Sequence, residues 1–357
     1  MTLRPRARIH LDHIVDNWRR FCAMRPRRET AAVVKADAYG HGLPKVSEAL
    51  YDAGCQHFFV AYSFEGLAVR QAVGPHAVIY VLNGPDAYDD VIFRNAALTP
   101  VINSDQQFQI LVSWIQAGGA LPRGYALHFD TGMNRLGLPC SDAGSISEAA
   151  AQLPPALIMS HLACADQPEA GLNTTQLDRF HDVSALFPNV PTSLEASDGL
   201  FLDERFQSHL ARPGICLYGG GRPPSHLSLQ AGMTLEAPIL QVRACRAHET
   251  IGYGASHKLT TDTLVATVAL GYADGFPRSA SNAGYAMIDG VSCPILGRVS
   301  MDLITLNVSA VPHLARPGHF AQFFGTDLPL EDQAERAGTI GYELTAGLTA
   351  RVRRDYD

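Results

Sequence analysis

The chain has 357 residues, 46% hydrophobic and 18% charged, a composition typical of a globular protein with room for two domains. Its 35 acidic and 28 basic residues give a formal net charge of −7, which argues against a basic nucleic-acid-binding surface, and no stretch approaches the roughly 18 apolar residues of a membrane span. The seven cysteines form no CxxC pair, so we expect a cytoplasmic protein with no disulfide framework and no metal, membrane or nucleic-acid partner.

Short apolar runs alternate with longer amphipathic segments from residue 30 to about residue 220. We predict eight strands, at 30–36, 57–62, 77–83, 98–103, 125–130, 156–163, 192–197 and near 208–220. Helical patterns such as 43–54 and 104–118 lie between them and open with residues typical of helix starts. Eight strand–helix repeats in about 200 residues predict an α/β fold, a (β/α)8 TIM barrel that occupies residues 1–228.

The pattern changes beyond the segment "GGGRPPS" at 219–225, which is typical of a linker. Apolar runs at 237–248, 264–272, 285–290, 291–297, 302–308 and 319–325 follow one another with turns and no room for crossover helices. We therefore predict a mainly β C-terminal domain over residues 229–357. An additional strand at 6–12 precedes the first barrel helix, and we expect it to pair with this β-domain.

Lys35 is one of only three lysines and directly follows the apolar run of the first predicted barrel strand. A lysine at the edge of a core is desolvated, which favours its neutral, nucleophilic form. The structural alternative, a lysine stem lying along apolar surface with its charge in water, is also common. The residue is therefore a candidate nucleophile whose case depends on its neighbours.

Several other reactive or anion-binding residues fall where barrel strands end, the edge that carries barrel active sites. His161 ends strand six, Ser197 ends strand seven, Arg135 follows strand five, and Arg212 and Gly214 accompany strand eight. Taken singly, each is typical of a core hydrogen bond or a surface turn. Together, a nucleophilic lysine opposite a phosphate-binding turn predicts pyridoxal 5'-phosphate (PLP) held as a Schiff base.

Six segments, in order, resemble one known family across nearly the whole chain. They are "AVVKADAYGHG", "DTGMNRLG", "RPGICLYG", "IGYGAS", "GYADGFPR" and "GRVSMDLI", and the closing "YELTAGLTARVRRDY" is similar as well. On these motifs the chain resembles alanine racemase, the PLP-dependent isomerase of fold type III. The resemblance implies racemisation of L- and D-alanine.

The resemblance implies two acid–base residues. Lys35 would carry the Schiff base and serve one face of the substrate α-carbon, and Tyr253 would serve the other, as racemisation requires. Tyrosine, with an ordinary pKa near 10, is a poor base at neutral pH, and His161 and Arg212 would lower that value through a hydrogen-bond chain. Arg212 would also donate to the pyridine nitrogen of the cofactor.

The same resemblance implies how cofactor and substrate are bound. Arg135 and the backbone of Met301 would receive the substrate carboxylate, and Tyr272 would narrow the entrance so that a small amino acid is favoured. The phosphate would be held by neutral donors, namely Tyr39, Ser197, Tyr342 and the backbone N–H groups of Gly214 and Ile215. Since Tyr253 and Met301 lie in the β-domain, the family's arrangement implies a homodimer with two shared sites.

Two positions depart from the family pattern. Many members have a lysine, often carbamylated, where this chain has His128, so a carbamate that braces Arg135 cannot form here. Residue 300, often cysteine in the family, is Ser300.

Four other functions remain open at this point. One is a serine or broader-specificity racemase, and another is a decarboxylase of the same fold type that uses Cys293. A third is a non-enzymatic PLP-binding barrel, which would lack the second domain. The fourth is a Schiff-base aldolase, which would need no PLP.

Overall fold

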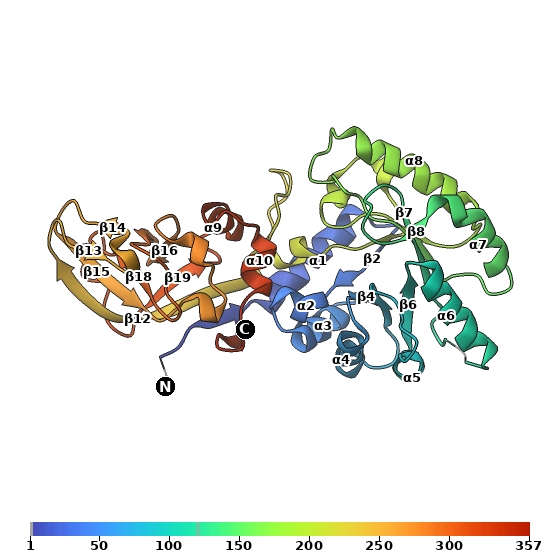
Figure 1. Cartoon of the computed structure of the whole chain (residues 1–357), viewed down its shortest axis with the longest axis horizontal. Coiled ribbons are helices and arrows are strands. Elements are labelled where there is room, and N and C mark those ends of the chain that lie inside the picture. Colours follow the sequence, from blue (N-terminus) through green and yellow to red (C-terminus); the bar gives the residue numbers. More distant parts are fainter. Residues whose placement is uncertain (1–2, 120) are drawn as a thin grey trace.

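The computed structural model describes residues 3–119 and 121–357. Residues 1 and 2 of the predicted first domain, and residue 120, lie outside the described part. The molecule is elongated, with the helix-covered barrel at one end and an antiparallel β structure at the other (Figure 1). Among the described residues no helix combines the length and apolarity needed to cross a bilayer.

The barrel is built from parallel strands at the positions that the sequence predicts. Seven of them form one sheet: β3 (Ala32–Val33), β4 (His57–Val60), β5 (Val78–Val81), β6 (Leu98–Ile102), β7 (Ala126–Asp130), β9 (Leu157–Met159) and β10 (Thr192–Ser193). The short β8 (Leu138–Pro139) pairs with β7 outside this circuit. These strands are buried on both faces, which explains why they are continuous apolar runs rather than alternating ones.

Backbone hydrogen bonds on both sides of β11 (Leu210–Ala211) close the barrel. This strand pairs in parallel with β2 (Glu29–Thr30), which leads directly into β3. The N–H of Ala31 donates to the carbonyl of Ala211, and the N–H of Arg212 donates to the carbonyl of Glu195, each at 2.9 Å. The predicted fold class, a (β/α)8 barrel followed by a mainly β part, is confirmed.

Helices surround the strands through most of the barrel but not at its end. The regular helices are α1 (Leu11–Met24), α3 (Leu43–Asp52), α4 (Ser63–Val73), α5 (Asp90–Asn95), α6 (Asp105–Gln116), α7 (Ala143–Ala150) and α8 (Gly171–Ala185). The last two strands are followed only by short 3₁₀ helices, including η2 (Asp198–Phe201) and η4 (Ile215–Tyr218). Here the structure departs from a regular strand–helix repeat, because the chain turns back at once at the rim.

The second part of the chain is organised around the long strand β12 (Met233–Cys245). The sheet order is β17-β16-β19-β12-β1-β20, with β15 and β18 continuing from β12. The other strands are β1 (Arg6–Ile9), β15 (Thr263–Val268), β16 (Tyr285–Ile288), β17 (Val291–Pro294), β18 (Ile304–Asn307), β19 (Phe320–Phe324) and β20 (Arg353–Tyr356), with a separate hairpin of β13 (Thr250–Ile251) and β14 (His257–Lys258). Strand β1, from the start of the chain, lies between β12 and β20.

Two helices that the sequence analysis did not identify, α9 (Leu330–Arg336) and α10 (Gly341–Ala346), lie between the two parts (Figure 1). A Cβ placed on Gly40 of the barrel would collide with the carbonyl of Thr345, so α10 rests directly on the barrel rim. On the other side, the side-chain amide of Asn17 donates to the carbonyls of Leu217 and Gln230 and accepts from the N–H of Gln230. These contacts fix α10 and the connecting segment against the barrel.

Candidate active site

A cavity of about 690 Å³ opens at the carboxyl ends of the barrel strands. Nine of the residues that the sequence analysis selected line this single cavity: Lys35, Tyr39, Arg135, His161, Ser197, Arg212, Gly214, Ile215 and Tyr342. His128, at the position that departs from the family pattern, lines it too. Residues as far apart in sequence as Lys35 and Tyr342 therefore meet at one opening.

Lys35 lies two residues beyond the end of β3 and immediately before an unusual turn. The four residues after it, 36–39, all have positive φ angles of 53° or 54° although none is glycine. Burial, together with the nearby charge of Arg135, lowers the pKa of Lys35. The amine is thereby biased toward its neutral form, the form able to act as a nucleophile or base.

The rim opposite Lys35 carries neutral hydrogen-bond donors suited to an anion. The N–H of Gly214, at the start of η4, donates to Ser197 Oγ at 2.9 Å, and the rings of Tyr39 and Tyr342 lie 6.0 Å apart. Burial raises the pKa of both phenols, so they remain protonated donors. A Cβ on Gly214 would lie 2.5 Å from Tyr39 Oη, so only glycine allows this approach.

Arg212 forms the floor between these groups. Its side chain is buried and donates to the carbonyl of Ser160 at 2.7 Å and to Ser193 Oγ. Burial lowers its pKa to about 10, against the opposing effect of Glu195, so the guanidinium still carries its charge at neutral pH. The Nδ1 atom of His161 lies 3.5 Å from the guanidinium.

The two histidines of the cavity are neutral. Burial, and then the charges of Arg212 and Arg135, lower the pKa of His161 to about 3. Burial and the charge of Arg212 likewise lower that of His128 to about 4. His128 Nδ1 lies 2.8 Å from Asn103 Oδ1, and since the amide nitrogen of Asn103 donates to two carbonyls, Nδ1 must be the donor. His128 is thereby fixed in one tautomer.

Arg135 is presented by a loop that its own sequence shapes. The carboxylate of Asp130 accepts from the N–H groups of Gly132 and Met133, each at 2.8 Å, which folds the chain back after β7. Gly137 has a φ of 130°, and a Cβ there would lie 2.6 Å from the backbone nitrogen of Asp130. The glycines of "DTGMNRLG" therefore have a structural role that places Arg135 at the cavity.

Three predicted site residues lie outside this cavity. Tyr253, Tyr272 and Met301 belong to the β part and are 73%, 42% and 52% exposed. Tyr272 and Met301 are neighbours, since the N–H of Ala273 donates to the carbonyl of Met301. Tyr253 lies between β13 and β14, at the end of the molecule far from the barrel (Figure 1). One chain therefore holds Lys35 at its cavity without Tyr253.

Several lining residues were missed from the sequence. They include Asn83, Met133, Leu136, Leu162, Asp166 and Asp198. Each follows a barrel strand closely, so a systematic reading of every strand end would have selected them.

Both halves of the chain match known domains. Residues 9–222 match the family described as "Alanine racemase, N-terminal domain", and residues 232–356 match "Alanine racemase, C-terminal domain". The chain belongs to the alanine racemase family. The resemblance inferred from the six motifs is confirmed.

Individual members of the family are similar over almost their full length. The alanine racemase of Rhodospirillum rubrum is 43% identical over 98% of this chain and 94% of its own. A catabolic alanine racemase of Agrobacterium fabrum is 41% identical over 98% and 91%. The crystal structure of alanine racemase from Bartonella henselae with covalently bound pyridoxal phosphate superposes with a TM-score of 0.92, at 31% identity over both whole chains.

The contact between Gly214 and Tyr39 gives a first prediction. We expect Gly214→Ala to weaken binding of PLP, the ligand of the Bartonella structure, about ten- to a hundredfold, because the new methyl group displaces Tyr39 from the rim. Titration of the apo-protein with PLP measures this. Gly144→Ala is the matched control, since a Cβ there meets nothing within 4 Å, and equal affinities of the two variants would contradict the prediction.

The neutral histidines give a second prediction, on acid stability. His128 and His161 protonate more readily in the unfolded chain than in the fold, so stability that is complete above about pH 6.5 is lost as the pH falls toward 4. We expect His128→Asn to reduce the slope of unfolding free energy against pH in this range by up to about 1.4 kcal/mol per pH unit. Urea unfolding at a series of pH values measures it. His181→Asn, at an exposed histidine of α8, is the matched control, and an unaltered slope in His128→Asn would refute the prediction.

Proposed function

We propose that this chain is a PLP-dependent alanine racemase in which each active site is completed by a second copy of the chain. The observation that carries the proposal is the meeting, in one cavity, of a desolvated lysine, an anion-binding rim and a buried arginine. Family membership over the whole chain supports the same conclusion.

The residues present fit the cofactor. Tyr39, Tyr342, Ser197 and the start of η4 form a cradle of neutral donors for a phosphate dianion. Lys35 faces the same cavity and would hold the coenzyme covalently. When bound, PLP supplies the electron-withdrawing ring that makes the α-hydrogen of the substrate acidic.

Arg212 would donate to the ring nitrogen of the coenzyme. Its guanidinium keeps its proton at neutral pH, so the ring nitrogen would stay largely unprotonated and act as a weaker electron acceptor. This arrangement favours return of the proton to the α-carbon over competing reactions. Through the neutral imidazole of His161, the charge of Arg212 would also stabilise the phenolate of Tyr253 of the partner subunit and so let it act as a base.

Two proton-transfer groups would flank the substrate. In one direction the neutral amine of Lys35 would remove the proton from one face and the hydroxyl of Tyr253 of the partner subunit would donate a proton to the other. In the reverse direction the phenolate of the partner's Tyr253 would remove the proton and the protonated amine of Lys35 would return one. Arg135 would bind the substrate carboxylate, together with the backbone of the partner's Met301. The partner's Tyr272 would restrict the entrance to small side chains such as that of alanine.

Exposed apolar side chains support the homodimer. The rings of Tyr62 and Phe64 stack at 5.5 Å, and these residues follow Ala61 of the cavity lining and are 53% and 65% exposed. Tyr253 and Met301 are exposed on the β part. Large exposed apolar groups at both places fit a two-fold-symmetric pair in which the β part of each copy covers the cavity of the other. We place the boundary between barrel and β-domain at residues 228 and 229.

Two further observations bear on the alternatives and on location. Cys293 is fully buried in β17, which disfavours a decarboxylase that uses this thiol. All seven cysteines are unpaired, as expected in a reducing compartment, and we propose a cytoplasmic location.

Mixing two inactive variants tests both the chemistry and the shared site. We expect Lys35→Ala to lose the visible absorbance of bound PLP and its racemase activity, and Tyr253→Phe to lose most activity while keeping the absorbance. In a mixed dimer, one site combines an intact Lys35 with an intact Tyr253, so an equal mixture should regain about a quarter of the original activity. Circular dichroism of L- and D-alanine measures racemisation.

Two results would contradict this proposal. An unmodified chain loaded with PLP that leaves L-alanine unchanged would refute the racemase. A mixture that stays inactive after the subunits have exchanged would refute the shared site.

A further inference from the structure

The turn at residues 36–39 adopts a conformation that its sequence does not favour. Left-handed helical geometry brings Cβ close to the following carbonyl, and only glycine adopts it freely. Here Ala36, Asp37, Ala38 and Tyr39 adopt it in succession. Contacts from elsewhere in the fold must therefore hold the turn.

Glu65 holds the start of the turn. It lies in the first turn of α4, is 8% exposed, and reaches across to the end of the first strand. Its Oε1 accepts a hydrogen bond from the N–H of Ala36 at 2.7 Å, and its Oε2 accepts from the N–H groups of Ala61 and Tyr62 at 2.8 and 3.1 Å. One buried carboxylate thus joins the turn to the end of β4 through three charge-assisted bonds.

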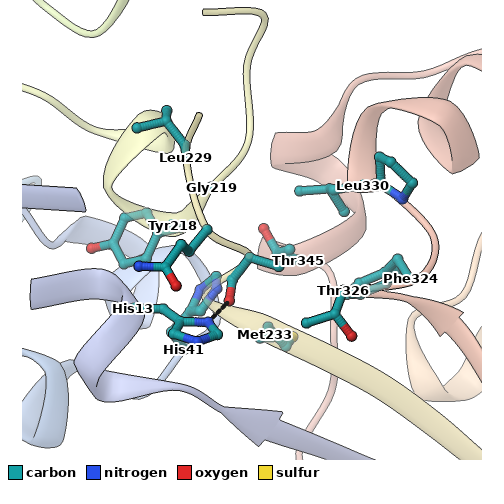
Figure 2. A pocket seen from close by; sticks show the side chains of 14 residues that line it. His13, His41, Tyr218, Gly219, Leu229, Met233, Phe324, Thr326, Leu330 and Thr345 are labelled. Atoms are coloured by element: carbon teal, nitrogen blue, oxygen red, sulfur yellow. Dashed lines mark hydrogen bonds between the residues drawn. The ribbon is translucent and has the colours of Figure 1, made fainter. Parts of the chain in front are cut away.

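His41 holds the other end. Its Nδ1 lies 3.0 Å from the carbonyls of both Ala38 and Tyr39, and its ring packs against Tyr218 at 4.5 Å. Figure 2 shows His41 and Tyr218 in the wall of a second, smaller cavity of about 280 Å³ behind the turn. The turn is therefore fixed at both ends, by Glu65 where it begins and by His41 where it finishes.

The left-handed path has a consequence for the active site. Lys35 stands immediately before the turn and Tyr39 is its last residue, and both side chains line the same cavity. A right-handed turn of the same length would redirect the chain after Lys35 and move Tyr39 from the rim. The spacing between the lysine and the phosphate-binding phenol therefore depends on the hand of this turn.

We propose that Glu65 is a positioning residue that holds residues 36–39 left-handed and so sets Lys35 and Tyr39 at the separation that PLP requires. The proposal rests on the proposed function in assigning Lys35 and Tyr39 to the coenzyme. Glu65 acts only through the backbone and touches no reacting atom.

Two substitutions test this role together. Glu65→Gln keeps the side-chain volume but turns an amide NH₂ toward backbone N–H groups that need an acceptor. We expect it to raise the dissociation constant for PLP about ten- to a hundredfold and to lower kcat more than it raises KM for alanine. Adding Ala36→Gly should recover about fivefold of that affinity, because glycine adopts the left-handed conformation without strain.

Ala149→Gly is the matched control for the second substitution. Ala149 is exposed and lies in the right-handed helix α7, so the same change there should recover nothing in the Glu65→Gln background. PLP titration of the apo-protein by absorbance and fluorescence measures all four chains. An unchanged PLP affinity in Glu65→Gln, or equal recovery by Ala36→Gly and Ala149→Gly, would overturn the proposal.

Folding failure is also decisive. If Glu65→Gln does not fold and Ala36→Gly does not recover it, Glu65 is a general support of the barrel and the proposal is wrong; recovery of a folded, PLP-binding chain supports it. Failure of the proposed function can be distinguished from failure of the role of Glu65. If the chain binds PLP but does not racemise alanine, the PLP titrations of the variants still test that role.

Discussion

The buried guanidinium of Arg212 is the group on which the rest of the barrel mouth depends. Its backbone N–H bonds to Glu195 and helps close the barrel, while its side chain is held by the carbonyl of Ser160 and the hydroxyl of Ser193. A buried guanidinium is tolerated only where its N–H groups have hydrogen-bond acceptors, and the strand ends provide them. The same residue therefore closes the barrel through its backbone and places a positive charge at the cavity through its side chain.

That charge shapes the chemistry around it. Burial together with that charge keeps His161 and His128 neutral, and burial together with the charge of Arg135 lowers the pKa of Lys35. Neutral imidazoles accept as well as donate hydrogen bonds, so they can transmit the influence of Arg212 without adding positive charge. The cavity thus combines permanent cations with neutral, proton-transferring neighbours, a combination suited to moving a proton at carbon.

The barrel fold and many residues of the cavity could be predicted from the sequence. Parallel strands buried on both faces are visible as apolar runs, and the reactive residues follow those runs. The left-handed conformation of residues 36–39 could not be predicted, because Ala-Asp-Ala-Tyr is typical of a right-handed helix. The carboxylate that holds the turn left-handed belongs to Glu65, in α4. The sequence offers one indication of Glu65, since it is an acidic residue at the third position of a helix. The structure shows that this position is buried. Helix α10, which brings Tyr342 to the rim, is too short for its periodicity to be distinctive.

The position of β1 has a consequence for how the chain reaches its final form. This strand precedes the barrel in the chain, yet its neighbours β12 and β20 are made after the barrel. The barrel can assemble first, whereas the sheet remains incomplete until β20, at its edge beside β1, has been made. Completion of the sheet then joins β1 to β20, so the order of biosynthesis leaves the β part as the final element to become cooperative with the rest.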